Sequence, residues 1–322
     1  MTSLAQVTAL VDAHVSRDND RFRSITLQIA AHVSSRSERG ADHLRRLVEN
    51  QQALSFVPLP SASGLLSAPS NLFTLDDMVL APWVRERLDR VVLEQSRRRD
   101  LFAQKLRPAR KLLFTGPPGV GKTMAAGALS RAIDMPMFRV ELHGVISQFL
   151  GETSSKLAKV FEHVRSMPAV YLFDEFDAIG AERSSLGSEA AGAEMRRVVN
   201  SLLQFVEDDR SDSLIVAATN HDQMLDSAIF RRFDEVVAFG SPTRDEVIAL
   251  VRCRLADIDP DQLDASAIYS AVANPGLGHA DVCAALDRVR KDHVLVGTAI
   301  DTRSIVASIV TRTRGTSTEA CS

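Results

Sequence analysis

The sequence predicts an α/β protein in which a parallel sheet covered by helices is followed by a small domain made only of helices. Between residues 72 and 242, short apolar runs alternate with helical stretches, which is typical of parallel strands joined by crossover helices. From residue 243 to residue 322 only helical patterns follow. The 322 residues, 45% of them hydrophobic, suffice for one large domain and one or two smaller ones.

The first 56 residues are predicted to form a helical N-terminal region. Apolar residues recur at helical spacing in three runs between residues 3 and 54. So short a region rarely buries a strong core alone, and we expect it to pack on something else. Residues 57–71 are rich in Pro, Ser, Ala and Gly and are predicted to be a linker to the α/β domain.

Composition narrows the class of partner and the compartment. The net charge of −3 gives no reason to expect nucleic acid or an anionic membrane as a partner. No apolar segment is long enough to span a membrane, and early aspartates exclude a signal-peptide core. The cysteines lack metal-ligand or disulfide-framework spacing, so we expect free thiols in a cytoplasmic protein; they are Cys253, Cys283 and Cys321.

The strands of the α/β domain are predicted from short apolar runs that end in turn or polar residues. Each run is four to eight residues long, as expected for a strand buried on both faces. The five runs are Lys111–Thr115, Met137–Glu141, Ala169–Phe173, Leu214–Ala218 and Glu235–Phe239.

A glycine-rich loop follows the first of these strands. Gly116–Thr123 reads GPPGVGKT and leads directly into a helical stretch that begins at Met124. Glycines let backbone N–H groups wrap phosphates, the lysine reaches the β- and γ-phosphates, and the threonine hydroxyl binds Mg²⁺. The predicted nucleotide contacts are Pro118, Gly119, Val120, Gly121, Lys122, Thr123 and Met124.

Two further strands end in polar residues that suit the same chemistry. Asp174 and Glu175 follow the strand that ends at Phe173. Asp174 is predicted to hold Mg²⁺, and Glu175 to polarise the attacking water. Asn220 follows another strand and can hydrogen-bond the γ-phosphate or that water. Taken alone, solvated acids and a turn asparagine would be the simpler interpretation, but the loop upstream favours the catalytic one.

Together these motifs resemble the AAA family of ATPases, over about three quarters of the chain from Leu72 to Thr311. Gly116–Thr123 resembles its Walker A motif, Val170–Glu175 its Walker B motif, and Thr219-Asn220 its sensor 1. The resemblance implies an αβα sandwich with a five-stranded parallel sheet and a helical lid. ATP and Mg²⁺ would be bound between sheet domain and lid.

The segment Leu225–Asp234 resembles the place where this family carries its arginine fingers. Many relatives have a Pro-Gly pair between two arginines, whereas here Arg231 and Arg232 are adjacent. Both are therefore assigned, and the sequence does not rank them; surface salt bridges are the alternative. Because such arginines act on a neighbouring subunit's ATP, the resemblance implies a homo-oligomeric ring, by analogy a hexamer.

Two other segments resemble the family's adenine contacts. Gly276–Val282 is similar to the lid signature, but His279-Ala280 replaces the usual Gly-Ala. His279 is therefore expected to stack on the nucleotide or to crowd it. Asp76–Val79 loosely resembles the segment that enters the adenine pocket through its backbone, which assigns Asp77 to the site.

A pore loop is also implied. Phe149, Leu150 and Gly151 lie where the family places an aromatic–hydrophobic–glycine loop that grips a polypeptide in the central channel. Apolar contact is non-directional and needs no particular substrate sequence. The alternative is that Phe149 belongs to the core. Arg196 and Arg197 resemble residues of the helix that faces the neighbouring subunit, or are simply solvated.

The sequence thus predicts an ATPase that remodels or unfolds protein substrates, with substrate or adaptor binding assigned to the N-terminal helices. The alternative is an ATP-gated assembly or switch module that recruits a partner without threading it. That partner could be a separate protease, as in bacterial defence systems with stand-alone AAA proteins, since this chain has no protease motif of its own. Nucleic-acid translocation is disfavoured because Phe149-Leu150 lacks basic neighbours.

Overall fold

The computed structural model describes residues 8, 25–26, 64–69, 73–145, 150–175, 200–220, 227–255, 263–273 and 276–319. The chain divides into two compact units, Met1–Val57 and Pro58–Ser322. In the first unit Thr8, Ile25 and Thr26 are helical, and the remainder of the predicted helical region lies outside the described residues.

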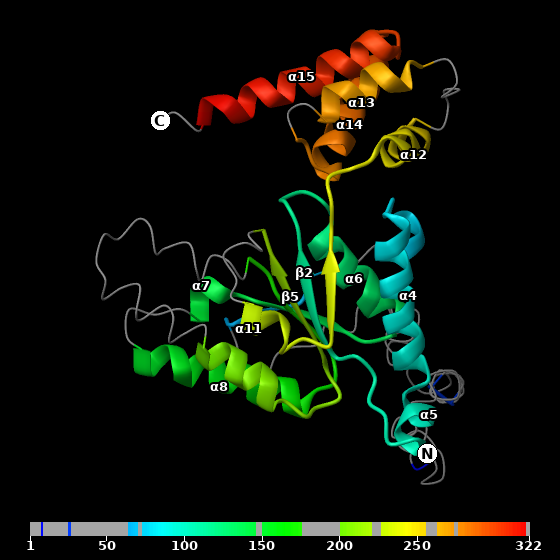
Figure 1. Cartoon of the computed structure of the whole chain (residues 1–322). Helices are drawn as coiled ribbons and strands as arrows, with labels where there is room; N and C mark the ends of the chain where they lie inside the picture. The colour runs from blue at the N-terminus through cyan, green and yellow to red at the C-terminus, as the bar shows by residue number, and fades with distance from the viewer. Residues whose placement is uncertain are drawn as a thin grey trace, which may run out of the picture. The chain divides into compact units, whose positions relative to one another are not determined.

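A six-stranded sheet with the order β1-β3-β4-β5-β2-β6 forms the centre of this unit (Figure 1). All five predicted strands are confirmed, and every pairing among them is parallel. In the structure they are β2 (Lys111–Thr115), β3 (Met137–Val140), β4 (Val170–Phe173), β5 (Leu214–Thr219) and β6 (Glu235–Ala238).

The sixth strand, β1 (Leu66–Ser67), lies in the segment predicted as a linker and pairs antiparallel with β3. Leu66 is buried against the sheet edge, and the Ser67 hydroxyl donates to Glu141 Oε1 at 2.5 Å. Two residues show no periodicity, so the sequence pattern could not reveal this strand.

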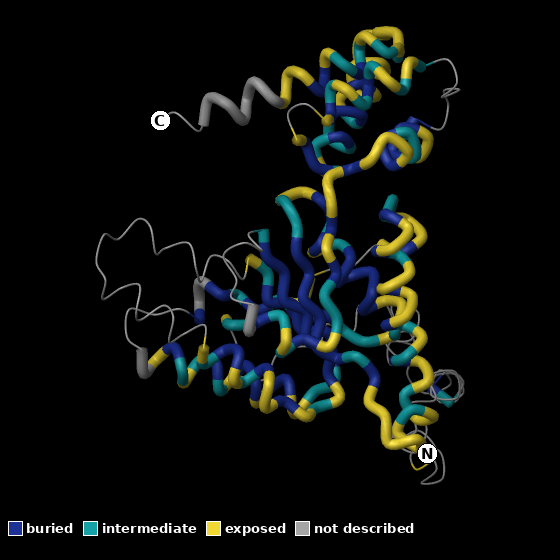
Figure 2. The backbone as a smooth tube through the Cα atoms, viewed as in Figure 1, coloured by how far each residue is buried: buried dark blue, intermediate teal, exposed yellow. Residues whose placement is uncertain are grey.

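Helices cover both faces of the sheet, as Figure 1 shows. One face packs on α4 (Pro82–Ser96) and α6 (Lys122–Ala132). The short 3₁₀ helix η2 (Leu75–Asp77) comes before α4 in the chain, and β2 lies between α4 and α6. Alternate strand residues such as Leu112, Phe114 and Leu172 are fully buried there. Figure 2 shows these central strands as buried, which explains why they read as continuous apolar runs.

The other face packs on α8 (Leu150–Ser166) and on a helix at residues 200–208. Phe161 of α8 stacks on Phe173 of β4 at 5.8 Å between ring centroids and on Phe205 at 5.1 Å. Shorter helices also belong to this α/β part of the unit, namely α5 (Arg98–Ala103), α7 (Leu142–Val145) and α11 (Ser227–Phe230).

The helical patterns after residue 243 form four helices, which confirms the predicted all-helical segment. They are α12 (Arg244–Arg254), α13 (Ala265–Ala273), α14 (His279–Val296) and α15 (Thr302–Glu319). Their buried side chains, among them Leu250, Ile268, Leu286 and Ile305, form a core of their own. Within the described ranges, no helix has the length and apolar character needed to cross a membrane.

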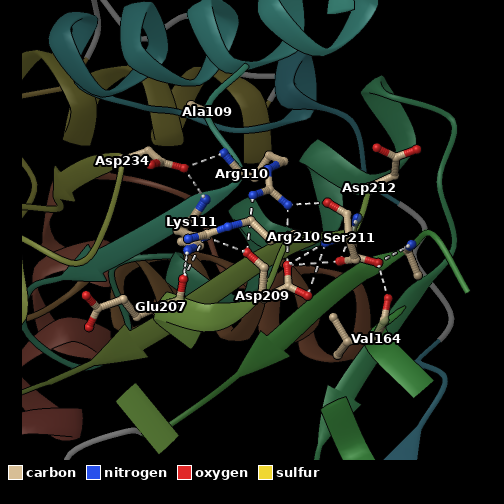
Figure 3. Close-up of polar contacts among 12 residues, drawn as sticks. Ala109, Arg110, Lys111, Val164, Glu207, Asp209, Arg210, Ser211, Asp212 and Asp234 are labelled. Atoms are coloured by element: carbon tan, nitrogen blue, oxygen red, sulfur yellow. Dashed lines mark hydrogen bonds and ion pairs between the residues drawn. The ribbon is translucent and has the colours of Figure 1, made fainter. Parts of the chain in front are cut away.

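A buried polar network lies where β2, β5 and β6 begin (Figure 3). Asp209 and Arg110 form an ion pair at 3.3 Å, with side chains 1% and 8% exposed. Asp234 Oδ2 accepts from the backbone N–H groups of Arg110 and Lys111 at 2.9 and 3.0 Å. The Lys111 ammonium donates to Glu207 O at 2.9 Å. The network fixes the segment that enters β6 to the start of β2.

Replacing Asp209 with alanine is therefore expected to destabilise this unit. The Arg110 guanidinium would stay buried without its carboxylate, and breaking a buried pair in this way costs about 3 kcal/mol. Urea unfolding followed by circular dichroism measures the change. Arg90→Ala is the control, because its pair with Glu94 at 2.7 Å leaves the Arg90 side chain 70% exposed, and exposed pairs contribute little. Equal midpoints for the two variants would contradict this role of the network.

Candidate nucleotide-binding site

The glycine-rich loop connects the carboxyl end of β2 to the start of α6, as the sequence predicts. Gly116 has φ 138°, and a Cβ placed on it would lie 2.0 Å from Phe239 O, so no larger residue fits. Gly121 has φ 99° and caps the first turn of α6. Pro118 and Gly119 are exposed, while Val120 is buried. The loop thus presents the amino end of α6, where unpaired N–H groups favour an anion.

Lys122 and Asn220, which are far apart in sequence, meet beside this loop. Lys122 is buried, with 6% of the residue exposed, and its Nζ donates to Asn220 Oδ1 at 2.8 Å. The same ammonium donates to the carbonyls of Gly116 and Pro117 at 2.6 and 2.8 Å. The contact exists because all five residues of β2 pair with β5, and β5 ends just before Asn220.

A second pair joins Thr123 to Asp174. The Thr123 hydroxyl donates to Asp174 Oδ2 at 2.8 Å, and Arg139 Nη2 lies 3.5 Å from the same oxygen. Thr123 lies in the first turn of α6 and Asp174 follows β4, so both predicted metal ligands lie at one edge of the sheet. Met124, the next residue of α6, is half-buried.

This pair suits a magnesium ion better than a metal held by the protein alone. Mg²⁺ usually takes one or two protein oxygens and keeps waters and substrate phosphates as its other ligands. A hydroxyl and a carboxylate 2.8 Å apart beside a phosphate loop supply that set. Among the residues that the structure describes, no cluster of three or more His, Cys, Asp or Glu side chains could hold a metal.

Glu175 has an unusual backbone next to this pair. Its φ is 53°, in the left-handed region that a residue with a side chain adopts at some cost, and its N–H donates to Asp174 Oδ1 at 3.0 Å. The side chain is exposed at the edge of the sheet where Lys122 and Thr123 lie. This backbone conformation occurs directly after Asp174, which accepts the Thr123 hydrogen bond.

A pocket adjoins the loop at Val120. It has about 270 Å³ of empty space, partly open to solvent. It is lined by Val79, Leu80, Ala81, Trp83, Val84, Val120, Phe239, Gly240, Ser241, Glu246 and His279. Most of the lining is apolar, with a few polar groups, as in sites for small organic ligands.

The start of α14 is attached to the glycine-rich loop. The Ala280 N–H donates to Gly119 O at 2.8 Å. A Cβ on Gly278 would lie 2.8 Å from Pro118 O, so this approach requires a glycine. His279 stands between Gly278 and Ala280 and lines the pocket, which places the two predicted lid residues beside the loop.

Asp77 has a different position from its neighbours. Its exposed carboxylate accepts from the Thr74 hydroxyl and the Thr74 N–H, both at 2.7 Å, and these bonds lower the pKa of Asp77. The pocket is lined instead by Val79 and Leu80 of the same segment. The Asp77 side chain caps η2, and the residues after it reach the pocket.

The two arginines lie at the opposite end of the sheet from this loop. They precede Asp234, whose carboxylate binds the amides at the start of β2, whereas the loop begins where β2 ends. Five strand residues span about 16 Å. Arg231 is exposed, and Arg232 Nε lies 3.6 Å from Glu207 Oε2. Neither guanidinium is therefore placed at the phosphate loop of its own chain.

Several predicted residues cannot be compared with the structure. Phe149, Arg196 and Arg197 lie outside the described residues, and Leu150 and Gly151 are placed only as the first residues of α8, without their side chains. Conversely, sequence reasoning missed Arg139 and Glu246. An arginine inside an apolar strand was the signal for Arg139, since charged residues are rarely placed in central strands unpaired.

Comparisons with known proteins agree with the geometry. Residues 112–241 match the model of the family described as "ATPase family associated with various cellular activities (AAA)". The AAA family ATPase y4kL of Sinorhizobium fredii is 37% identical over 241 residues, which cover 71% of this chain and 72% of that protein. The ATP-dependent zinc metalloprotease FtsH 4 of Sphaerobacter thermophilus is 33% identical over 198 residues, 58% of this chain and 30% of its own length.

A solved structure shares the fold. The crystal structure of the FIGL-1 AAA domain superposes with a TM-score of 0.56 at 21% identity, over 77% of this chain and 85% of that one. Fold and site together define a P-loop nucleotide-binding protein. Within that class the chain belongs to the AAA family, and it is an ATPase.

Lys122→Ala is expected to weaken ATP binding by about 100-fold or more, because a buried ammonium that several acceptors hold beside the loop is lost. Isothermal titration calorimetry with ADP and ATP measures the change. Lys159→Ala, which removes an exposed lysine of α8, is the matched control and should bind like wild type. Tight binding by Lys122→Ala would refute the assignment of the loop.

Proposed function

We propose that this ATPase hydrolyses Mg²⁺-bound ATP in a homo-oligomeric ring and uses the cycle to remodel protein substrates. The observation that carries the catalytic part is the meeting of Lys122 with Asn220 and of Thr123 with Asp174 at one edge of the sheet. Thr123 and Asp174 would hold Mg²⁺, which when bound neutralises charge on the phosphates. Glu175 would polarise the attacking water, and Asn220 would orient it or the γ-phosphate.

The position of the arginines supports the proposed ring. About 16 Å of strand separates Arg231 and Arg232 from the loop of their own chain. A guanidinium that stabilises charge on the transferring phosphoryl group must touch it. If the arginines stabilise the phosphoryl group, they would do so at a site in another subunit. A hexamer, with Arg196 and Arg197 at the same interface, is the assembly that the family resemblance suggests.

Remodelling of a polypeptide is proposed from the pore-loop motif Phe149-Leu150-Gly151. One relative is named an ATP-dependent zinc metalloprotease, FtsH 4, although this chain spans only 30% of it. No HExxH motif occurs in the present sequence. A protein substrate or adaptor would bind the N-terminal helices, and any proteolysis would belong to a separate partner.

The second candidate function is an ATP-gated switch that recruits or activates such a partner without threading a chain. It shares the nucleotide chemistry and differs only at the pore loop. The two are therefore separated by variants of Phe149, which leave the nucleotide site unchanged.

Glu175→Gln is expected to bind ATP but to hydrolyse it very slowly, and the double variant Arg231→Ala/Arg232→Ala to lose about 1000-fold in turnover. Mixing the two should restore activity. In a mixed ring, a chain with an intact Glu175 can lie beside a chain with intact arginines. Phosphate release measures turnover.

The control for this mixture is a chain that carries all three substitutions. Mixed with the double-arginine variant it offers no intact arginine, so no activity should return. If the first mixture is as inactive as this control, the arginines do not act across subunits. The proposal that a neighbouring subunit completes the site is then wrong.

Phe149→Ala should keep at least half of the basal ATPase activity and lose remodelling if the ring threads its substrate. A trap tests this: tagged Glu175→Gln is held with ATP, and co-purifying proteins are identified by mass spectrometry. A partner that is enriched with Glu175→Gln and absent with Glu175→Gln/Phe149→Ala supports threading. A partner retained by both variants supports the switch.

A further inference from the structure

The two ring nitrogens of His279, a partly buried residue, have no hydrogen bond within the described part of the chain. Its side chain is 15% exposed, and both ring nitrogens are buried with no hydrogen-bond partner among the described residues. Buried polar groups are nearly always paired, because leaving one unpaired costs free energy. An unpaired imidazole that lines a pocket therefore points to a ligand that completes its hydrogen bonds.

The pocket is in the right place for the base of a bound nucleotide, an inference that rests on the proposed function. Phosphates on the glycine-rich loop would have their terminal group beside Lys122 and Asn220. The remainder of the nucleotide must then leave the loop on another side. Val120 connects the loop to the pocket, and the Ala280–Gly119 hydrogen bond keeps His279 next to both.

Most of the pocket could hold a flat base only by apolar contact. Val79, Leu80, Val84 and Phe239 contribute apolar surface. Such surface does not distinguish one base from another, since discrimination needs hydrogen bonds to the edge of the ring. His279, whose Nε2 lies 3.8 Å from Glu246 Oε2, is the described lining residue whose buried side-chain nitrogens lack a hydrogen bond.

The Glu246 carboxylate lies on the Nε2 side of the His279 imidazole. Its Oε2 lies 3.8 Å from His279 Nε2 and accepts a hydrogen bond from the Thr243 N–H at 2.7 Å. A carboxylate on that side favours the tautomer with the proton on Nε2. Nδ1 is then an acceptor with a lone pair. Burial lowers the pKa of His279, while Glu246 opposes this to a smaller extent, so the ring is neutral near pH 7.

We propose that His279 is a specificity-determining residue that reads position 6 of a purine base, with Nδ1 accepting a hydrogen bond from the 6-amino group of adenine. A base with a 6-oxo group places an acceptor there, opposite the lone pair of Nδ1, and is rejected. Glu246, which also lines the pocket, acts as a positioning residue because its carboxylate orients the imidazole.

Binding of nucleoside diphosphates to the full chain tests this without any contribution from hydrolysis. Isothermal titration calorimetry would compare ADP, IDP and purine riboside diphosphate, which carry an amino group, an oxo group and no group at position 6. Wild type is expected to bind ADP about tenfold more tightly than IDP, with the unsubstituted purine between them. His279→Ala should reduce the ratio to less than about threefold.

Two further variants make the result specific. His279→Phe keeps a flat ring without a hydrogen-bond acceptor and should also lose the preference, even if His279→Ala fails to fold. His293→Ala removes an exposed histidine of the same helix, whose Nδ1 lies 2.8 Å from Thr298 O, and should keep the wild-type ratio.

The outcomes separate this inference from the function on which it rests. Equal affinity of wild type for ADP and IDP, or an unchanged ratio in both His279 variants, would overturn the role of His279 while leaving the nucleotide site in place. If wild type binds none of the three diphosphates, the nucleotide site itself is refuted, and the inference is refuted with it.

Discussion

The pairing of β2 with β5 is the constraint on which the rest of the site depends. The register joins Lys111 to Ile215 and Thr115 to Thr219, so both strands end together. Parallel strands that end together bring the residues that follow them to one edge of the sheet. Lys122 can therefore reach Asn220. Strand β4 pairs with the other side of β5, so Asp174, which follows β4, lies at the same end of the sheet. A slip of one register position would move Asn220 away from the ammonium.

The opposite end of the same strands has an equally defined role. Asp234 binds the amides of Arg110 and Lys111, and Asp209 neutralises the Arg110 guanidinium in a buried network. These contacts hold Arg231 and Arg232 at the end of the sheet that their own nucleotide site does not use. The sheet thus separates the residues proposed to bind nucleotide from the arginines that would contact the nucleotide of a neighbouring subunit. The proposed assembly rests on this separation, which strand direction and length impose.

The contact between the lid and the glycine-rich loop depends on the absence of side chains. Gly278 allows the start of α14 to approach Pro118, and the Ala280 N–H then binds Gly119 O. The same approach carries His279 into the pocket beside Glu246. A histidine in this place is tolerated because it lies at the edge of a ligand site, where unpaired polar groups have a use that the core lacks.

The five parallel strands, the phosphate loop and the acids after β4 could be predicted from the sequence, because strand burial and glycine-rich turns are local properties that leave periodic or fixed-spacing patterns. The sequence also indicated that His279 was unusual, although not what surrounds it. The tertiary structure was needed to show that Arg139 lies beside Asp174 and that Glu246 lies near His279. It also showed that Asp77 caps η2 while Val79 and Leu80 line the pocket. The pairing of β1 with the sheet was likewise seen only in the structure. Each of these depends on side chains from separate elements meeting in space, and spacing along the chain carries no record of such meetings.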